Sequence, residues 1–218
     1  GELLGQLGRG VRVAGKIHTR FVEDRQGRIY FATMCEDSGP TNVDPYSWEG
    51  PHWMRYEPRA GKVENLGSMN RLWGAYGLAI DDKRNRLFAT TWDGHLYRYD
   101  IDDGRTHDLG RVDNWDDVRH IASDDEGNVY GPYPKARIWK YDARTERVYD
   151  LSVQFPYDHL VFPRRMSNPM LDRKAIWRVV DWDPGDRVLY GVDGSSSLLF
   201  KYDPKDGPEG KATFLARL

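Results

Sequence analysis

The chain has 218 residues, the length of a single compact domain. Its 32 basic and 34 acidic residues give a net charge of −2, so neither a nucleic acid nor an anionic membrane surface is expected as a partner. A mean hydropathy of −0.75 without a long apolar run excludes a transmembrane helix, and the single cysteine, Cys35, excludes an internal disulfide framework.

Aromatic and turn-forming residues are both abundant. The chain contains 8 Trp, 13 Tyr and 7 Phe, together with 22 Gly and 12 Pro. Aromatic side chains fit pleated surfaces, whereas Gly and Pro mark turns. We therefore predict an all-β fold rather than a helical bundle.

The opening segment resembles a pattern that recurs later in the chain. ELLGQLG, within residues 1–10, has the form of VENLG at 63–67 and THDLG at 106–110. Because those two later segments each close a repeating unit, we expect residues 1–10 to be the outer strand of a preceding unit. The alternative is a loosely packed tail.

The first complete unit contains four short strands. FVEDRQGRIYF at 21–31 predicts two strands joined by a tight polar turn. HWMRYEP at 52–58 alternates apolar and polar residues before a turn, as a third strand should. VENLG supplies the fourth strand.

The four-strand pattern recurs three more times. Forty-two residues separate Asp82 from Asp124, and 42 also separate Tyr99 from Tyr141, a period typical of propeller blades. We predict one β-propeller domain over residues 1–218, with four four-stranded blades visible as part of a larger ring of six to eight blades. The blades span approximately residues 17–67, 75–110, 118–152 and 176–218.

Two long connections interrupt the repeats, at residues 35–51 and 155–175. Because neighbouring antiparallel strands alternate in direction, both connections emerge on the same side of the disc, which we call the looped face. Long loops usually carry function, so the site is expected there. The turns on the opposite face are short and rich in Asp and Gly, which predicts ordinary hairpin chemistry.

The innermost and third strands of each blade begin on the looped face. Several of their first residues carry imidazole, phenol, guanidinium or indole groups, where a purely structural position would hold small or aliphatic ones. These candidates are His18, Arg20, His52, Trp53, Tyr76, His95, Arg119, His120, Arg137, Trp177 and Arg178.

A structural role is the competing interpretation of these residues. Polar aromatic side chains at strand starts can hold elements together by hydrogen bonds, and we favour that role for His95. For His18 and Tyr76 the two interpretations weigh about equally, because convergent polar groups in a concave mouth are the default hypothesis for a site.

The candidate residues fit the cleavage of an acidic sugar polymer. The sequence lacks GxSxG, P-loop, CxxC and HExxH motifs, so acyl transfer, nucleotide hydrolysis, thiol and zincin chemistry have no support. Aromatic platforms suit sugar rings, and arginine suits a uronate carboxylate. In a β-elimination, arginine would neutralise the carboxylate and acidify the adjacent C5 proton. His18 would remove that proton and Tyr76 would protonate the leaving oxygen.

We accordingly divide the candidates into two groups. The catalytic group is His18, Tyr76, His52, Arg119 and Arg178. The substrate-binding group is Arg20, Trp53, His95, His120, Arg137 and Trp177.

Three segments carry a resemblance to a known group of enzymes. They are GKIHTRFVEDRQGRIYFATM, PHWMRYEPRAGKVENLG and YGLAIDDKRNRLFATTWDGHLYRYD. They resemble the β-propeller polysaccharide lyases of the ulvan and oligogalacturonate type, and uncharacterised propellers of carbohydrate-degrading bacteria. The resemblance implies His and Tyr as base and acid and Arg against the uronate. It also implies a divalent metal held by several histidines in the oligogalacturonate members, although the sequence itself assigns no metal ligand.

Two other functions remain open at this point. The first alternative is a non-catalytic propeller that binds a carbohydrate or a protein partner through its looped face. A lactonase-like or quinoprotein-like propeller ranks last, because the strand starts lack the acidic and amide ligands that a bound cation needs. If the protein is a lyase, its partner would be an anionic polysaccharide or oligosaccharide. We would then expect the protein itself to act outside the cell or in the periplasm.

Overall fold

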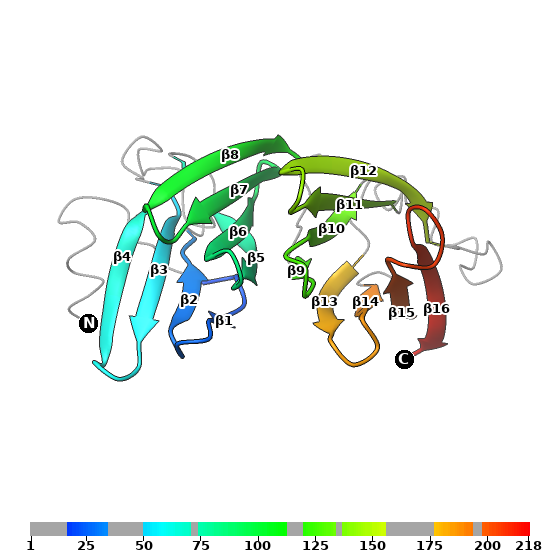
Figure 1. The fold of residues 1–218 in the computed structure, drawn as a ribbon, viewed down its shortest axis with the longest axis horizontal. Helices are drawn as coiled ribbons and strands as arrows, with labels where there is room; N and C mark the ends of the chain where they lie inside the picture. The colour runs from blue at the N-terminus through cyan, green and yellow to red at the C-terminus, as the bar shows by residue number, and fades with distance from the viewer. Residues whose placement is uncertain are drawn as a thin grey trace, which may run out of the picture.

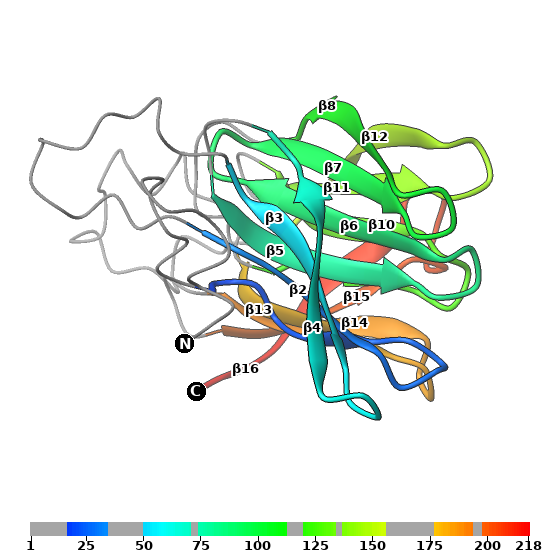
Figure 2. The same ribbon diagram turned by 90° about the vertical axis from the view of Figure 1, so that its left-hand side faces the viewer.

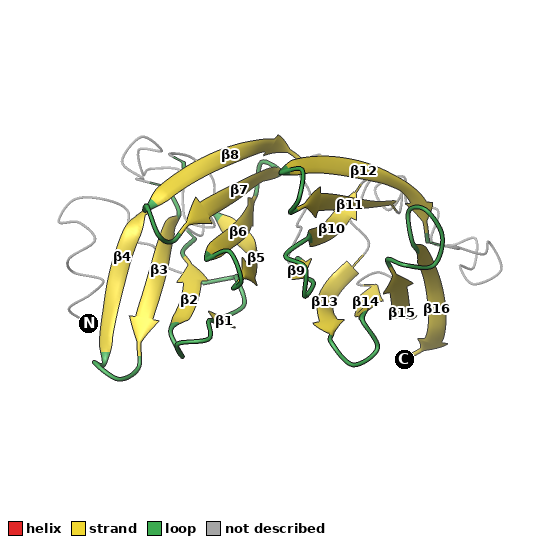
Figure 3. Cartoon of the chain, viewed as in Figure 1, coloured by secondary structure: helices red, strands yellow, loops and turns green. Residues whose placement is uncertain are grey.

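A computed structural model describes residues 17–34, 50–70, 74–112, 120–133, 137–155, 177–193 and 198–218. Within these ranges all regular structure is β-strand, arranged as four antiparallel sheets of four strands each (Figure 3). The all-β class and the four-strand repeat are therefore confirmed. No helix that could span a membrane occurs among the residues described.

Each sheet is formed by four strands that are consecutive in the sequence, and we call it a blade. Blade 1 contains β1 (Val22–Glu23), β2 (Ile29–Ala32), β3 (His52–Glu57) and β4 (Lys62–Ser68). Blade 2 contains β5 (Ala75–Asp81), β6 (Arg86–Thr91), β7 (His95–Asp100) and β8 (Arg105–Arg111). Blade 3 contains β9 (Ala122–Ser123), β10 (Val129–Tyr133), β11 (Arg137–Asp142) and β12 (Arg147–Gln154). Blade 4 contains β13 (Trp177–Asp183), β14 (Val188–Asp193), β15 (Leu198–Asp203) and β16 (Lys211–Arg217).

The four blades fan out in an open arc (Figure 1). Strands β1, β5, β9 and β13 lie at its inner side, whereas β4, β8, β12 and β16 follow its outer rim, as the turned view in Figure 2 also shows. Meandering four-stranded sheets arranged around a common axis are the architecture of a β-propeller. Residues 1–10 lie outside the described residues.

Apolar clusters between neighbouring blades form the core. Between blades 1 and 2, for example, Tyr30 and Trp53 pack with Leu78 and Leu87, all four fully buried. Comparable clusters join blade 2 to blade 3 and blade 3 to blade 4. Successive side chains of a strand point to opposite faces of the sheet. Alternate residues are therefore buried against the preceding blade and against the following blade.

Glycine on the second strand makes room for a large ring on the third. A Cβ atom on Gly131 would lie 2.1 Å from the Trp139 ring, and one on Gly191 would lie 2.3 Å from the Phe200 ring. The two pairs occupy equivalent places, since β10 pairs Gly131 with Trp139 and β14 pairs Gly191 with Phe200. At these two places the missing side chain lets the indole or phenyl ring approach the backbone of the second strand closely.

Aspartates shape the turns between the first and second strands. Asp24 accepts hydrogen bonds from the backbone N–H groups of Gln26 and Arg28, each at 2.9 Å. Asp124 does the same for Glu126 and Asn128. The hairpin chemistry predicted for these turns is thus confirmed.

The strand register corrects one step of the sequence alignment. In blade 2 the residue equivalent to Asp24 is Asp81, which pairs with Arg86 at the end of β5, and not Asp82. The β5–β6 turn is one residue longer than the β1–β2 turn, so an alignment of Asp82 with Asp24 is shifted by one residue. Asp82 instead receives the side chain of Arg25 from blade 1.

Candidate functional site

An aromatic cluster lies on the looped face where blades 1 and 2 meet. His18 precedes β1, Tyr76 is near the start of β5, and Trp92 follows the end of β6. The rings of His18 and Tyr76 stack with centroids 5.1 Å apart and planes 23° apart. Trp92 stands edge-on to Tyr76, with a centroid distance of 5.7 Å. We call these three residues the aromatic rim.

Accessibility differs among the members of the aromatic rim. Tyr76 is 5% exposed, whereas Trp92 is 37% exposed and His18 is half-buried. Ile17, the chain neighbour of His18, is 44% exposed. The rim therefore has a buried phenol at its base and apolar and indole surface open to a ligand.

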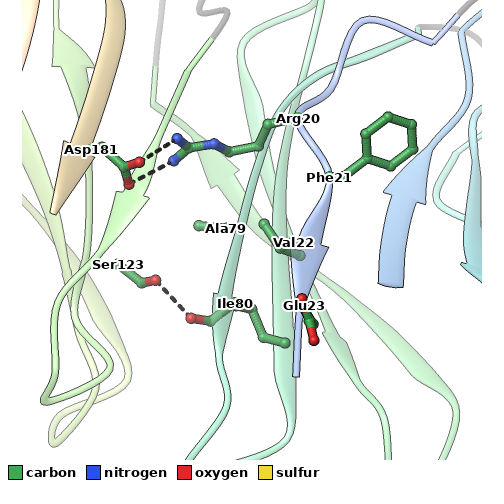
Figure 4. Close-up of a pocket in the computed structure, with 8 residues that line it drawn as sticks. All are labelled: Arg20, Phe21, Val22, Glu23, Ala79, Ile80, Ser123 and Asp181. Atoms are coloured by element: carbon green, nitrogen blue, oxygen red, sulfur yellow. Dashed lines mark hydrogen bonds and ion pairs between the residues drawn. The ribbon is translucent and has the colours of Figure 1, made fainter. Parts of the chain in front are cut away.

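The centre of the arc contains a cavity of about 250 Å³ (Figure 4). Its wall comes from the innermost strands of all four blades: Arg20, Phe21, Val22, Glu23, Ala79, Ile80, Ser123 and Asp181 line it. Arg20 crosses this space to Asp181 of β13, and its two guanidinium nitrogens lie 3.1 and 2.8 Å from the carboxylate oxygens. The Ser123 hydroxyl donates to the carbonyl of Ile80 at 2.6 Å.

Arg20 is consequently engaged by the protein itself. Its guanidinium is bound bidentately by Asp181, and the side chain is only 23% exposed. A uronate would have to displace a carboxylate that already occupies the same donors. The expected substrate-binding arginine instead joins blade 1 to blade 4.

The two tryptophans proposed as a sugar platform lie inside the molecule. Trp53 is fully buried, packs on Tyr99 at 5.5 Å and donates its indole N–H to Thr106. Trp177 is 1% exposed and stacks on Phe200 at 5.5 Å. Because neither indole face is accessible, both residues join blades, and the expectation of an open platform at these positions is corrected.

The remaining histidines of the prediction are spread over separate blades. His52 is buried at the start of β3, where its backbone N–H donates to Thr33 Oγ1. His95 Nδ1 lies 3.0 Å from both carboxylate oxygens of Asp108 on the adjacent strand, which matches the structural role favoured for it. His120 accepts the Trp177 indole N–H through its carbonyl at 2.8 Å.

The other predicted arginines do not come together at one site either. Arg137 pairs with Asp150 at 2.6 Å and lies over the ring of Tyr133. Arg178 is exposed, at an irregularity in the pairing of β13 with β14. Arg119 lies outside the described residues, as do most of the two long connections at 35–51 and 155–175. Of the proposed catalytic group, the structure brings His18 and Tyr76 into contact.

The face opposite the looped face is occupied by ion pairs between turns. A second cavity there, of about 290 Å³, is lined by Arg25, Asp81, Asp82, Lys83, Ser123, Asp124 and Asp125. Arg84 donates to the carbonyl of Glu126 in blade 3, and Arg187 of blade 4 pairs with the Glu126 side chain. Each of these contacts links one blade to the next, so the charged residues of these turns have a structural role.

The metal site of the oligogalacturonate lyases has no counterpart in the described part of the chain. No group of three His, Cys, Asp or Glu side chains is found there that could hold a metal ion. The described histidines are spread over three blades: His18 and His52 belong to blade 1, His95 and His107 to blade 2, and His120 to blade 3. The residues in hand therefore do not fit the histidine-bound metal that the resemblance implies.

Sequence reasoning missed two residues of this region. Trp92 lies in the short turn WDG before His95, and its position at the end of a second strand could have placed it on the looped face. Asp181 takes the place of the apolar residues Val22, Ala79 and Ala122, as the strand register shows. A charged residue at a position that is apolar in the other three repeats could have indicated that Asp181 has a special role.

No protein-family model and no curated protein matches the sequence. Among solved structures, the chain is similar to one from a crystal structure of a nidogen/laminin complex, with 14% identity and a TM-score of 0.63. The match covers 94% of this chain and 66% of that one. The fold is that of a β-propeller. A structural genomics protein of unknown function from Bacteroides thetaiotaomicron is also similar, with 13% identity and a TM-score of 0.57.

This propeller spans only part of the chains that it resembles. It covers 66% of the nidogen/laminin chain and 43% of the Bacteroides thetaiotaomicron chain. Identities of 13 and 14% carry the fold and nothing finer. The function therefore has to be argued from the site.

Proposed function

We propose that this propeller is a non-catalytic binding module that engages a protein partner through the aromatic rim on its looped face. The observation that carries the proposal is the rim itself: Trp92 is 37% exposed and stands edge-on to the buried Tyr76, and Ile17, the chain neighbour of His18, is 44% exposed. Tryptophan and tyrosine are the residue types that most often dominate the energy of protein interfaces.

The state of the other candidate residues supports binding over catalysis. The guanidinium of Arg20 is held by Asp181, and the two indoles expected to carry a sugar are buried. A lyase needs an accessible cation against its uronate and an accessible proton donor. At 5% exposure, Tyr76 serves better as a rigid support for Trp92 than as an acid that reaches a polymer.

The chemistry of the rim favours a protein over a polysaccharide. An exposed indole that stands edge-on to a tyrosine presents an apolar surface, and Ile17, the chain neighbour of His18, adds apolar area that is 44% exposed. Such a surface fits an apolar side chain of a protein partner in a desolvated pocket. One of the similar solved structures is a nidogen/laminin complex, which is in keeping with this use of the fold.

The Trp92→Ala variant tests the proposed interface. Proteins retained by the immobilised wild-type chain but not by Trp92→Ala would be purified, and their affinities measured by calorimetry. Losing a central indole should weaken binding at least about tenfold, since hot-spot truncations cost about 2 kcal/mol or more. Gln26→Asp, in an exposed turn of the opposite face, is the matched control and should bind as the wild type does. Equal retention by Trp92→Ala and wild type would contradict the proposal.

The stacked contact of His18 and Tyr76 favours one second candidate, the polysaccharide lyase. An imidazole and a phenol with ring centroids 5.1 Å apart are two of the groups that β-elimination uses, and Arg178 is exposed near the start of β13. In that mechanism His18 would take the C5 proton while Tyr76 returned a proton to the leaving oxygen. The lyase is the second candidate because the phenol of Tyr76, its proposed acid, is buried.

The His18→Ala variant tests the lyase. If the chain cleaves a uronate polysaccharide, a 4,5-unsaturated product should absorb in the ultraviolet, and His18→Ala should reduce its rate of formation by ~10²–10⁴-fold. The same assay with Gln26→Asp should be unaffected. Absorbance that does not develop with any of a panel of uronate polysaccharides would remove the lyase and leave the binding module.

A further inference from the structure

Two aspartates lie near the looped-face end of blade 2, the blade that also carries Trp92. Asp93 directly follows Trp92 in the short turn between β6 and β7. Asp108 of β8 is opposite Tyr97 of β7 in the strand pairing. We call Asp93 and Asp108 the acidic flank of the aromatic rim.

The two carboxylates of the acidic flank act on the same phenol. Burial, together with the charges of Asp108 and Asp93, raises the pKa of Tyr97 to about 12. His95 stacks on Tyr97 with ring centroids 6.2 Å apart, and its Nδ1 lies 3.0 Å from the Asp108 carboxylate. The acidic flank is therefore one patch on blade 2 rather than two separate charges.

In the described part of the chain, neither carboxylate of the acidic flank forms an ion pair with a lysine or an arginine. Asp93 accepts a hydrogen bond from the Thr91 hydroxyl at 2.5 Å, and Asp108 accepts one from the Gly110 N–H at 2.8 Å. The ionisable partner of Asp108 is His95, which is charged only when it is protonated. Because a carboxylate offers about four acceptor positions, both groups can accept further hydrogen bonds.

Three arginines of the looped face do not supply the missing cation. Arg20 pairs with Asp181, and Arg137 pairs with Asp150. Arg111, at the end of β8, has contacts of its own, and none of the ion pairs between described residues joins it to the acidic flank. A cation from outside the chain would therefore meet two carboxylates that no described arginine occupies.

The acidic flank and the indole of the rim are both accessible to a partner. The Asp108 side chain is 46% exposed and Trp92 is 37% exposed, whereas Asp93 is half-buried. A long basic side chain can lay its methylene stem on apolar surface while its charged head stays in polar surroundings. An indole also attracts a cation that lies over its ring. Arginine and lysine are the side chains that combine both properties.

We propose that the segment bound at the aromatic rim carries an arginine or lysine beside its apolar anchor, and that the acidic flank holds this cation. Charge complementarity identifies the partner: two carboxylates without a lysine or arginine, next to an exposed indole, favour a basic segment and disfavour an acidic one. The inference rests on the proposed function, because the cation acts where the anchor meets Trp92.

Selection from a library of random short peptides tests the composition of the segment. Peptides are selected on the immobilised wild-type chain, and those that also bind Trp92→Ala are removed. The remaining peptides should carry arginine or lysine beside an aromatic or aliphatic residue more often than the unselected library does. Peptides that depend on Trp92 without this enrichment would overturn the inference and leave the proposed function standing. A library that yields no Trp92-dependent peptide would overturn both.

A cycle of peptide and protein variants tests the acidic flank itself. The tightest selected peptide is compared with a neutral copy, in which citrulline replaces arginine or acetyl-lysine replaces lysine. Each is titrated by calorimetry against the wild type and against the flank variant, Asp93→Asn with Asp108→Asn, at about pH 8, where imidazoles are neutral. The flank variant should bind the basic peptide about two- to thirtyfold more weakly, the effect of two exposed ion pairs. The neutral copy should bind both proteins alike, which also shows that the flank variant is folded.

Asp103→Asn with Asp206→Asn is the matched control, because it removes the same charge from exposed turns of the opposite face. This control should bind the basic peptide as the wild type does. Added salt should weaken the basic peptide more on the wild type than on the flank variant, since it screens the pairs that only the wild type forms. Equal losses for the basic and neutral peptides on the flank variant would show that the two aspartates act through structure, and would overturn the proposal.

Discussion

At the scale of the residue, single carboxylates organise the turns that join the strands. Asp142 accepts hydrogen bonds from the backbone N–H groups of Arg144 and Thr145, at 3.1 and 3.0 Å, and from Lys140 at 3.1 Å. Burial raises the pKa of Asp142, but the Thr145 and Lys140 contacts outweigh burial and lower that pKa to about 2. Asp24 behaves similarly: burial raises its pKa, whereas hydrogen bonds from Arg28 lower it overall.

These carboxylates should make the stability of the fold sensitive to acid. A pKa that is lower in the folded chain means that the unfolded chain binds more protons, so the stabilisation is complete above the ordinary aspartate pKa of about 4. It is lost as the pH falls toward about 2. Asp142→Asn should lower the free energy of unfolding at pH 7 by about 1 kcal/mol or less and flatten its decline between those limits. Urea titrations across this range would measure both effects.

Glu23→Gln provides the matched control for that titration. Glu23 is exposed and, among the described residues, makes no ion pair or side-chain hydrogen bond. Its substitution should leave the pH profile of the wild type in place. An Asp142→Asn profile as steep as that of the wild type would show that other carboxylates determine the acid sensitivity.

At the scale of the element, blades 3 and 4 depend on close approach between their second and third strands. Gly131 lies beneath the fully buried Trp139, and a Cβ atom there would overlap the indole. Gly131→Ala should therefore displace the ring and lower the free energy of unfolding by about 1–3 kcal/mol, as overpacking of a core does. The shift in urea midpoint measures this loss. Gly185→Ala, in the exposed β13–β14 turn, should cost much less, and an equal cost would contradict the packing argument.

The elements were more predictable than the contacts between them. The segments FVEDRQGRIYF and HLYRYD alternate apolar with polar residues and are bounded by turn-forming Asp and Gly residues. Strands and turns can be predicted from such segments because both patterns are local properties of the sequence. Whether Trp53 or Trp177 faces solvent or a neighbouring blade depends on the next repeat in space, which local patterns do not report. The contact of His18 with Tyr76 was predictable because both lie at the looped-face end of an innermost strand. The pairing of Arg20 with Asp181 was not, since it spans 161 residues and four blades.

At the scale of the whole molecule, one ion pair joins the first blade to the last. Arg20 and Asp181 meet inside the arc, where the innermost strands of all four blades line the central cavity. The contact is bidentate, yet the Asp181 side chain is 70% exposed. Water and salt therefore screen an interaction whose geometry is otherwise favourable.

A double-mutant cycle should detect this pair and show that it is modest. Arg20→Ala, Asp181→Ala and the double variant should give a coupling free energy of about 0.2–1 kcal/mol in low salt, the range of exposed ion pairs. In ~1 M salt the screening length falls to about 3 Å, so the coupling should shrink toward zero. Arg20→Ala leaves Asp181 at a 70% exposed position, and Asp181→Ala leaves Arg20 with 23% of its side chain in contact with water, so neither single variant should unfold the blades. A coupling that is absent in low salt would mean that packing between blades 1 and 2, 2 and 3, and 3 and 4 holds the arc without this pair.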